Sequence, residues 1–64
     1  MTYYDVLGRM KDEAKQIELF TNALFLATDG GEVDKITMNV IKHAVEMNDL
    51  AWAMIRHREV GDVN

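Results

Sequence analysis

One short segment, Thr28-Asp29-Gly30-Gly31, is the only strong helix-breaking signal in this chain of 64 residues, which contains no proline. A glycine there can adopt the left-handed conformation that ends a helix, so we expect Gly30 or Gly31 to close a first helix. On both sides of the segment, apolar residues recur at the three- and four-residue spacing of a helix. The sequence therefore predicts an all-α fold in which residues 1–64 form one antiparallel helical hairpin. The expected elements are a helix over about 2–29, a turn over 29–34 and a helix over about 34–60.

The predicted helix ends rest on capping residues. Thr2 and Asp5 have the spacing of a capping box, in which each side chain bonds the backbone amide of the other residue. Asp34 is the expected cap of the second helix, with Asp29 and Thr37 as alternatives. Gly8 is the weak point of the first helix. The apolar row expected along that helix is Tyr3, Leu7, Met10, Ala14, Ile17, Thr21 and Leu24, with Val6, Phe20 and Ala27 widening it.

A hairpin of this size needs additional stabilisation. A domain of 64 residues buries only about 60% of the surface of its unfolded chain, and the absence of cysteine excludes disulfides. The apolar arcs of both helices are also wider than one neighbouring helix can cover. We therefore expect two hairpins to pair as a four-helix bundle, unless a different protein covers the same surface or Gly8 breaks the first helix into two. The residues expected at the oligomer interface are Ile17, Phe20, Leu24, Val40, Met47, Asn48, Ala51, Trp52 and Met54.

Charge and hydropathy argue against several classes of partner. The net charge is −4, with seven basic and eleven acidic residues, which disfavours attraction to nucleic acid or to anionic lipid. No apolar run reaches 18 residues, and the first residues lack the basic and apolar segments of a signal peptide. We expect a cytoplasmic protein that binds neither nucleic acid nor membrane.

Two groups of polar residues in the second helix are candidate sites. Asn48 falls within the apolar arc, where it either pairs across an oligomer interface and fixes its register or contacts a ligand in the bundle core. His43, Glu46 and Asp49 are expected on one solvated strip with Lys42, where Lys42 and Glu46 have the spacing of an ion pair. We expect no metal site and no cofactor. The chain also contains no serine or cysteine nucleophile, so the leading expectation is a protein without enzymatic activity.

Two resemblances to known families concern different parts of the chain. The layout of two long helices and a short turn resembles the Rop family of plasmid proteins, which pair as antiparallel bundles, although the basic RNA-binding residues of that family have no counterpart here. The segment Glu46-Met47-Asn48-Asp49 resembles the acidic motif of the all-helical MazG-like nucleotide pyrophosphatases, in which such residues bind magnesium. That family also uses a second acidic pair, which this chain lacks.

Apolar residues near the turn indicate a partner-binding surface. Phe25 lies off the main arc of the first helix and Met38 lies at the edge of the arc of the second, so both are expected to be exposed and to bind a protein partner. The leading interpretation is a homo-oligomeric interaction module, such as a small regulator or inhibitor of the kind that plasmids and phages encode. The alternative is an oligomeric binder or magnesium-dependent hydrolase of a small phosphorylated nucleotide, using Glu46 and Asp49.

Overall fold

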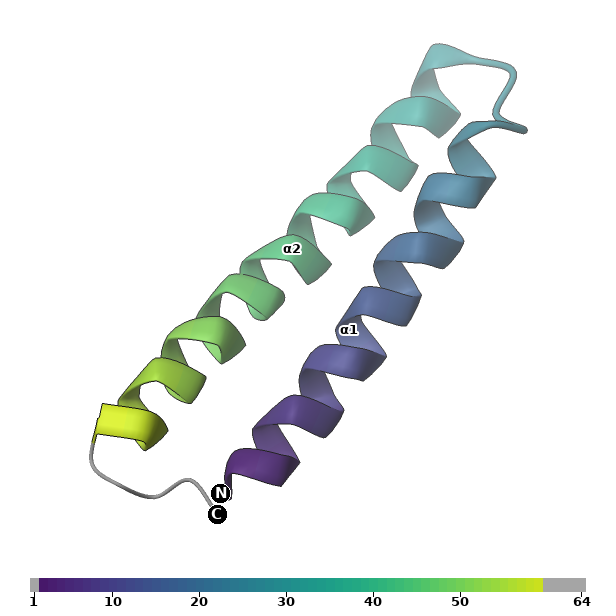
Figure 1. The fold of residues 1–64 in the computed structure, drawn as a ribbon. Helices are drawn as coiled ribbons and strands as arrows, with labels where there is room; N and C mark the ends of the chain where they lie inside the picture. The colour runs from purple at the N-terminus through teal and green to yellow at the C-terminus, as the bar shows by residue number, and fades with distance from the viewer. Residues whose placement is uncertain (1, 60–64) are drawn as a thin grey trace.

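The computed structural model describes residues 2–59, which form two α-helices joined by a short loop. Helix α1 spans Tyr3–Leu24 and helix α2 spans Gly30–Glu59. The helices run side by side in opposite directions, with the loop at one end of the molecule (Figure 1) and contacts between them along the pair. The predicted all-helical hairpin is therefore confirmed. The end predicted near residue 60 for the second helix lies outside the described residues.

Helix α1 begins with the predicted capping box. The Asp5 amide donates a hydrogen bond to the Thr2 hydroxyl oxygen at 3.2 Å, and the Thr2 amide donates to the Asp5 carboxylate at 3.1 Å. Hydrogen bonding from the backbone of Thr2, and then from its side chain, holds the pKa of the Asp5 carboxyl below its usual value. The ionised carboxylate also lies in the first turn of the helix, where negative charge is favourable.

The predicted end of the first helix near residue 29 is wrong, because α1 ends at Leu24. The amides of residues 25, 26 and 27 each bond the carbonyl three residues earlier, at 3.2, 3.0 and 3.4 Å. This tighter pattern satisfies the last carbonyls of the helix, and the cap residue Phe25 itself keeps a right-handed helical backbone. The turn therefore begins within an apolar stretch that the sequence pattern assigned to the helix.

Helix α2 begins at Gly30 instead of near residue 34, and its cap is Asp29. The Asp29 carboxylate accepts a hydrogen bond from the Glu32 amide at 2.8 Å, and the Asp29 carbonyl accepts one from the Val33 amide at 3.1 Å. Gly30 and Gly31 are therefore in the first turn of α2, and neither has a left-handed backbone. The expectation that one of them closes the first helix is wrong, and the turn covers residues 25–29.

One row of side chains on each helix lies against the other helix. The rows repeat at alternating spacings of three and four residues, as in a coiled coil. Of the described residues, only Val6 and Leu50 are buried, and Val6 is completely so. The row on α1 is Tyr3, Val6, Met10, Glu13, Ile17, Phe20 and Leu24, and the row on α2 is Ile36, Val40, His43, Met47, Leu50 and Met54. We call these two rows together the seam.

The predicted apolar row of the first helix is therefore wrong at three of its positions. Leu7 and Ala14 are exposed and Thr21 is half-buried. The seam instead uses Val6 and Phe20, which the widened row includes, and Glu13, which it does not. Gly8 does not interrupt α1, and a Cβ atom at this position would meet nothing within 4 Å. The alternative in which Gly8 divides the first helix is thus excluded.

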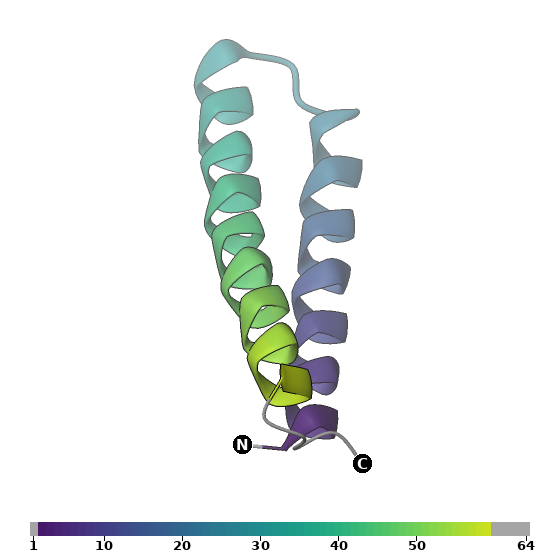
Figure 2. The ribbon, with the colours of Figure 1, turned by 60° about the vertical axis from the view of Figure 1, so that its left-hand side comes forward.

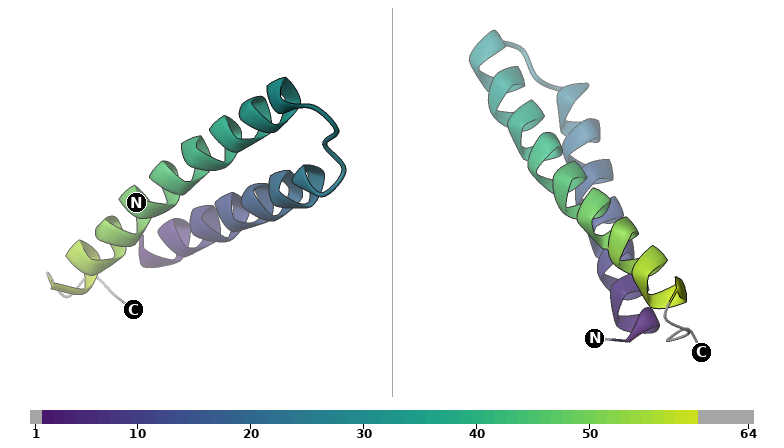
Figure 3. Two further views of the ribbon diagram at one scale, coloured as in Figure 1. Left: turned by 90° about the horizontal axis from the view of Figure 1, so that it is seen from above. Right: turned by 90° about the vertical axis from the view of Figure 1, so that its left-hand side faces the viewer.

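The hairpin is strongly elongated. Its principal extents are 48 × 14 × 13 Å and its radius of gyration is 14.8 Å, compared with about 11 Å for a compact domain of the same length. The views in Figures 2 and 3 show that no further element covers the outer side of either helix within residues 2–59. Neither helix in this part of the chain is long and apolar enough to cross a membrane.

Candidate interaction surface

A polar pair interrupts the apolar seam. Glu13 of α1 and His43 of α2 form a hydrogen-bonded pair through the carboxylate Oε2 and the imidazole Nδ1, with side chains 23% and 22% exposed. The ring of Phe20 stacks on the imidazole, with centroids 5.6 Å apart and planes inclined by 22°. The predicted position of His43 on a solvated strip is wrong, because the seam holds this side chain between the two helices. Sequence reasoning also missed Glu13.

Apart from His43, the solvated strip predicted on α2 is exposed to solvent. Lys42, Glu46 and Asp49 are all exposed, and Lys42 and Glu46 form no ion pair with each other. Residues 2–59 contain no group of three or more histidine and carboxylate side chains that could hold a metal ion. Within one hairpin, Glu46 and Asp49 are therefore two isolated surface carboxylates.

The residues predicted for an oligomer interface fall into two sets. Six of them belong to the seam within a single hairpin, and these are Ile17, Phe20, Leu24, Val40, Met47 and Met54. Ala51 is half-buried beside the seam, whereas Asn48 and Trp52 are exposed. Burial of Asn48 therefore requires contact with another chain.

Helix α2 carries a second row of large side chains on its outer side. We call it the outer row, and it consists of Ile41, Val45, Asn48, Trp52 and Ile55. At about 100° per residue, this row is centred roughly 140° away from the seam, with Ile55 about 100° and Val45 about 180° away. Val45 and Trp52 are each 55% exposed and Ile41 is 56% exposed, although all three are large apolar side chains. Ile55, at the edge of the row nearer α1, is half-buried. Helix α2 is thus apolar well beyond the strip that α1 covers.

The turn carries the most exposed apolar side chains. Phe25 is 88% exposed and Leu26 is 80% exposed, because α1 ends before them and leaves both in the loop. Met38, also predicted at this surface, is 70% exposed on α2. Leu26 was missed, since the sequence pattern placed it inside a helix. Acidic residues follow directly, with Asp29, Glu32 and Asp34 all exposed.

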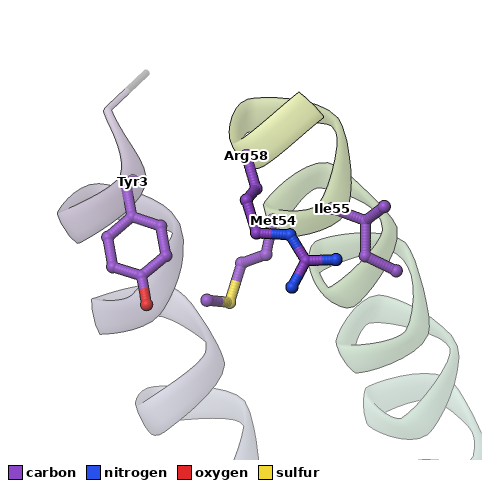
Figure 4. A pocket seen from close by; sticks show the side chains of 4 residues that line it. All are labelled: Tyr3, Met54, Ile55 and Arg58. Carbon is purple, nitrogen blue, oxygen red and sulfur yellow. The ribbon is translucent and has the colours of Figure 1, made fainter. Parts of the chain in front are cut away.

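A small hollow opens between the start of α1 and the end of α2. Tyr3 lines it from α1, and Met54, Ile55 and Arg58 line it from α2 (Figure 4). Its volume of about 240 Å³ is below the 300–1,000 Å³ that is usual for small-molecule sites. The geometry therefore favours contacts through extended apolar surfaces over enclosure of a small ligand here.

No known protein family, curated protein or solved structure matches this chain.

Proposed function

We propose that this chain is a non-enzymatic protein-interaction module that acts as a homo-oligomer, with two hairpins paired in a four-helix bundle and a larger protein as its target. The observation that supports this proposal is the outer row of α2. Large apolar side chains that are more than half exposed along several turns of one helix are typical of an interface. A single hairpin leaves them in water.

The surface area of the hairpin supports pairing with a second copy. The chain exposes 4873 Å², whereas a compact monomer of 7.3 kDa is expected to expose about 4,200 Å². A compact protein of twice this mass would expose about 6,900 Å². Pairing two hairpins in a compact assembly would therefore remove about 2,800 Å² from solvent, which lies within the range of about 2,000–5,000 Å² for obligate homodimers.

The turn supplies the surface proposed to bind the target. Phe25 and Leu26 are not needed for the seam, and their exposure gives two apolar anchors of the kind in which binding energy concentrates. Exposed carboxylates at Asp29, Glu32 and Asp34 lie next along the chain. The chemistry that fits this end of the hairpin is an apolar pocket with a basic rim on a larger protein.

Two measurements test this proposal. Sedimentation equilibrium at micromolar concentration should give a mass near twice the 7.3 kDa of the chain, and a helical monomer would contradict the homo-oligomer. Capture of a target from the native host should be lost with the double variant Phe25→Ser/Leu26→Ser. The matched control is Leu19→Ser, which changes an apolar side chain that is 54% exposed on α1 and should retain capture. Equal capture by both variants would exclude the turn as the target surface.

A further inference from the structure

We infer that the second copy binds along the outer row of α2, antiparallel to it, with the two-fold axis at Asn48. This inference rests on the proposed homo-oligomer and specifies the surface and the orientation that it uses. The partner is a second copy of this chain, because the outer row is self-complementary in spacing, in hydrogen bonding and in charge.

The spacing of the outer row is symmetric about Asn48. Ile41 lies seven residues before it and Ile55 seven residues after it. An isologous interface requires each residue to meet its counterpart from the same surface in reverse order. A two-fold axis at Asn48 therefore places Ile41 of one copy opposite Ile55 of the other. Val45 lies three residues before Asn48 and Trp52 lies four residues after it. The axis therefore brings Val45 of one copy and Trp52 of the other to nearly the same level on one flank of the interface.

Asn48 is suited to the centre of such an interface. Its side-chain amide contains both a donor group and an acceptor oxygen, so two copies facing each other across a two-fold axis can satisfy one another. An asparagine covered by an unrelated apolar surface would instead lose its hydrogen bonds to water without replacement. Asn48 is the only polar member of the outer row.

Small residues lie on the flank of the outer row nearer α1. Ala44 is exposed and Ala51 is half-buried, and both follow the same seven-residue interval. Short side chains at these positions allow two helices to approach closely, near the lower end of the usual 8–10 Å between axes. The two-fold axis places each flank against the same flank of the other copy. Val45 and Trp52 therefore pack against their counterparts on one side, and the alanines pack against theirs on the other.

The charge at the two ends of α2 favours the antiparallel orientation. In the first turns the acidic residues Glu32 and Asp34 outnumber the one basic residue, Lys35, and the last turn carries basic residues that include Arg56 and Arg58. With the axis at Asn48, Arg58 of one copy lies opposite residue 38 of the other, about one helical turn from Asp34. A parallel pair would instead place like charges together at both ends, which is unfavourable.

Engineered cysteines test both the surface and the orientation, because the chain contains no cysteine of its own. Under oxidation, Asn48→Cys should form a covalent dimer. Ile41→Cys alone should not, since in the antiparallel pair the two positions are about 21 Å apart along the axis, beyond the reach of a disulfide. An equimolar mixture of Ile41→Cys and Ile55→Cys should give the mixed dimer. Leu19→Cys, similarly exposed on α1, is the control and should remain uncrosslinked.

The outcomes separate this inference from the proposed homo-oligomer. Circular dichroism on each variant should first show parental helicity. If Ile41→Cys crosslinks with itself and the mixture gives no mixed dimer, the pair is parallel and the orientation is wrong. If sedimentation shows a dimer but neither Asn48→Cys nor the mixture crosslinks above the control, the outer row is not the interface although the homo-oligomer stands. If the parent chain is a monomer, both proposals fail.

Discussion

Replacement of His43 and Glu13 by leucine, singly and together, tests whether the polar pair in the seam stabilises the hairpin or is merely tolerated by it. Both side chains lie among apolar neighbours and are less than one quarter exposed. His43→Leu leaves the Glu13 carboxylate in that environment without its partner. The double variant removes both polar groups and leaves an uninterrupted apolar seam.

The expected magnitudes follow from the contacts. A hydrogen bond to a charged group contributes about 1.5–3 kcal/mol, and an aromatic stack such as that of His43 on Phe20 adds about 0.5–1.5 kcal/mol. Because leucine restores part of the packing and water reaches part of Glu13, we expect His43→Leu to lower the free energy of unfolding by about 2 kcal/mol. For a chain of this size, that corresponds to a fall in Tm of about 8–16 °C. The double variant should be at least as stable as the parent, as is common when a buried ion pair is replaced by apolar residues.

Thermal unfolding followed by circular dichroism measures these changes, provided that all variants are compared at one protein concentration, since association contributes to the apparent stability. The matched control is Glu46→Leu, which changes an exposed carboxylate on α2 and should alter the free energy of unfolding by less than about 0.5 kcal/mol. If the decreases in the free energy of unfolding caused by Glu13→Leu and His43→Leu simply add in the double variant, the two side chains are not energetically coupled. That result would contradict the expected stability of the double variant.

Two further predictions concern α1. Gly8→Ala should raise the free energy of unfolding by about 0.5–1 kcal/mol, because an added Cβ meets no atom within 4 Å; a lower Tm would show that a further chain contacts this position. Thr2→Ala should lower the free energy of unfolding by about 1 kcal/mol through loss of the cap. It should raise the pKa of Asp5 only part of the way towards its usual value, because the backbone amide of residue 2, which is the larger cause of the lowered pKa, is retained; NMR titration of the carboxyl measures this change. Because the folded chain holds that pKa below its unfolded value, the stabilisation linked to Asp5 is present above the usual aspartate pKa and is lost as the pH falls through the lowered one. An unchanged Asp5 titration in the Thr2 variant would contradict this assignment.

The fold was predictable because its determinants are local. Two long segments with helical periodicity, one capping box and one break specify two helices and a turn, and each of these signals acts within a few residues. The partners across the seam were not predictable in the same way. Glu13 beside Ala14 looks like the polar neighbour of an apolar position, and only His43 on the other helix makes its half-buried position favourable.

The turn was misplaced for a related reason. Leu24 and Ala27 keep the helical period and no helix-breaking residue precedes Thr28, so the sequence pattern extends the helix through Phe25 and Leu26. The Asp29 cap instead starts α2 at Gly30, and the residues before it must connect the two helices. Because the helix ends earlier than expected, Phe25 and Leu26 lie in the loop and are highly exposed, which makes them the candidate target surface.

Trp52 offers a direct readout of the surface used for association, because it is the only tryptophan in the chain and lies in the outer row. In a single hairpin its side chain is 55% exposed, and a second copy along the outer row would remove much of that exposure. Dilution through the association range should therefore shift its fluorescence emission to longer wavelength and increase quenching by acrylamide, in step with the fall in mass measured by sedimentation. Val45→Lys places a charge beside Trp52 in the proposed interface, so this variant should show the emission spectrum of the dissociated chain at every concentration. Leu19→Lys should behave like the parent. If the mass falls on dilution while the emission of Trp52 stays constant, the copies associate through a different face of the hairpin, and the outer row is left for the target.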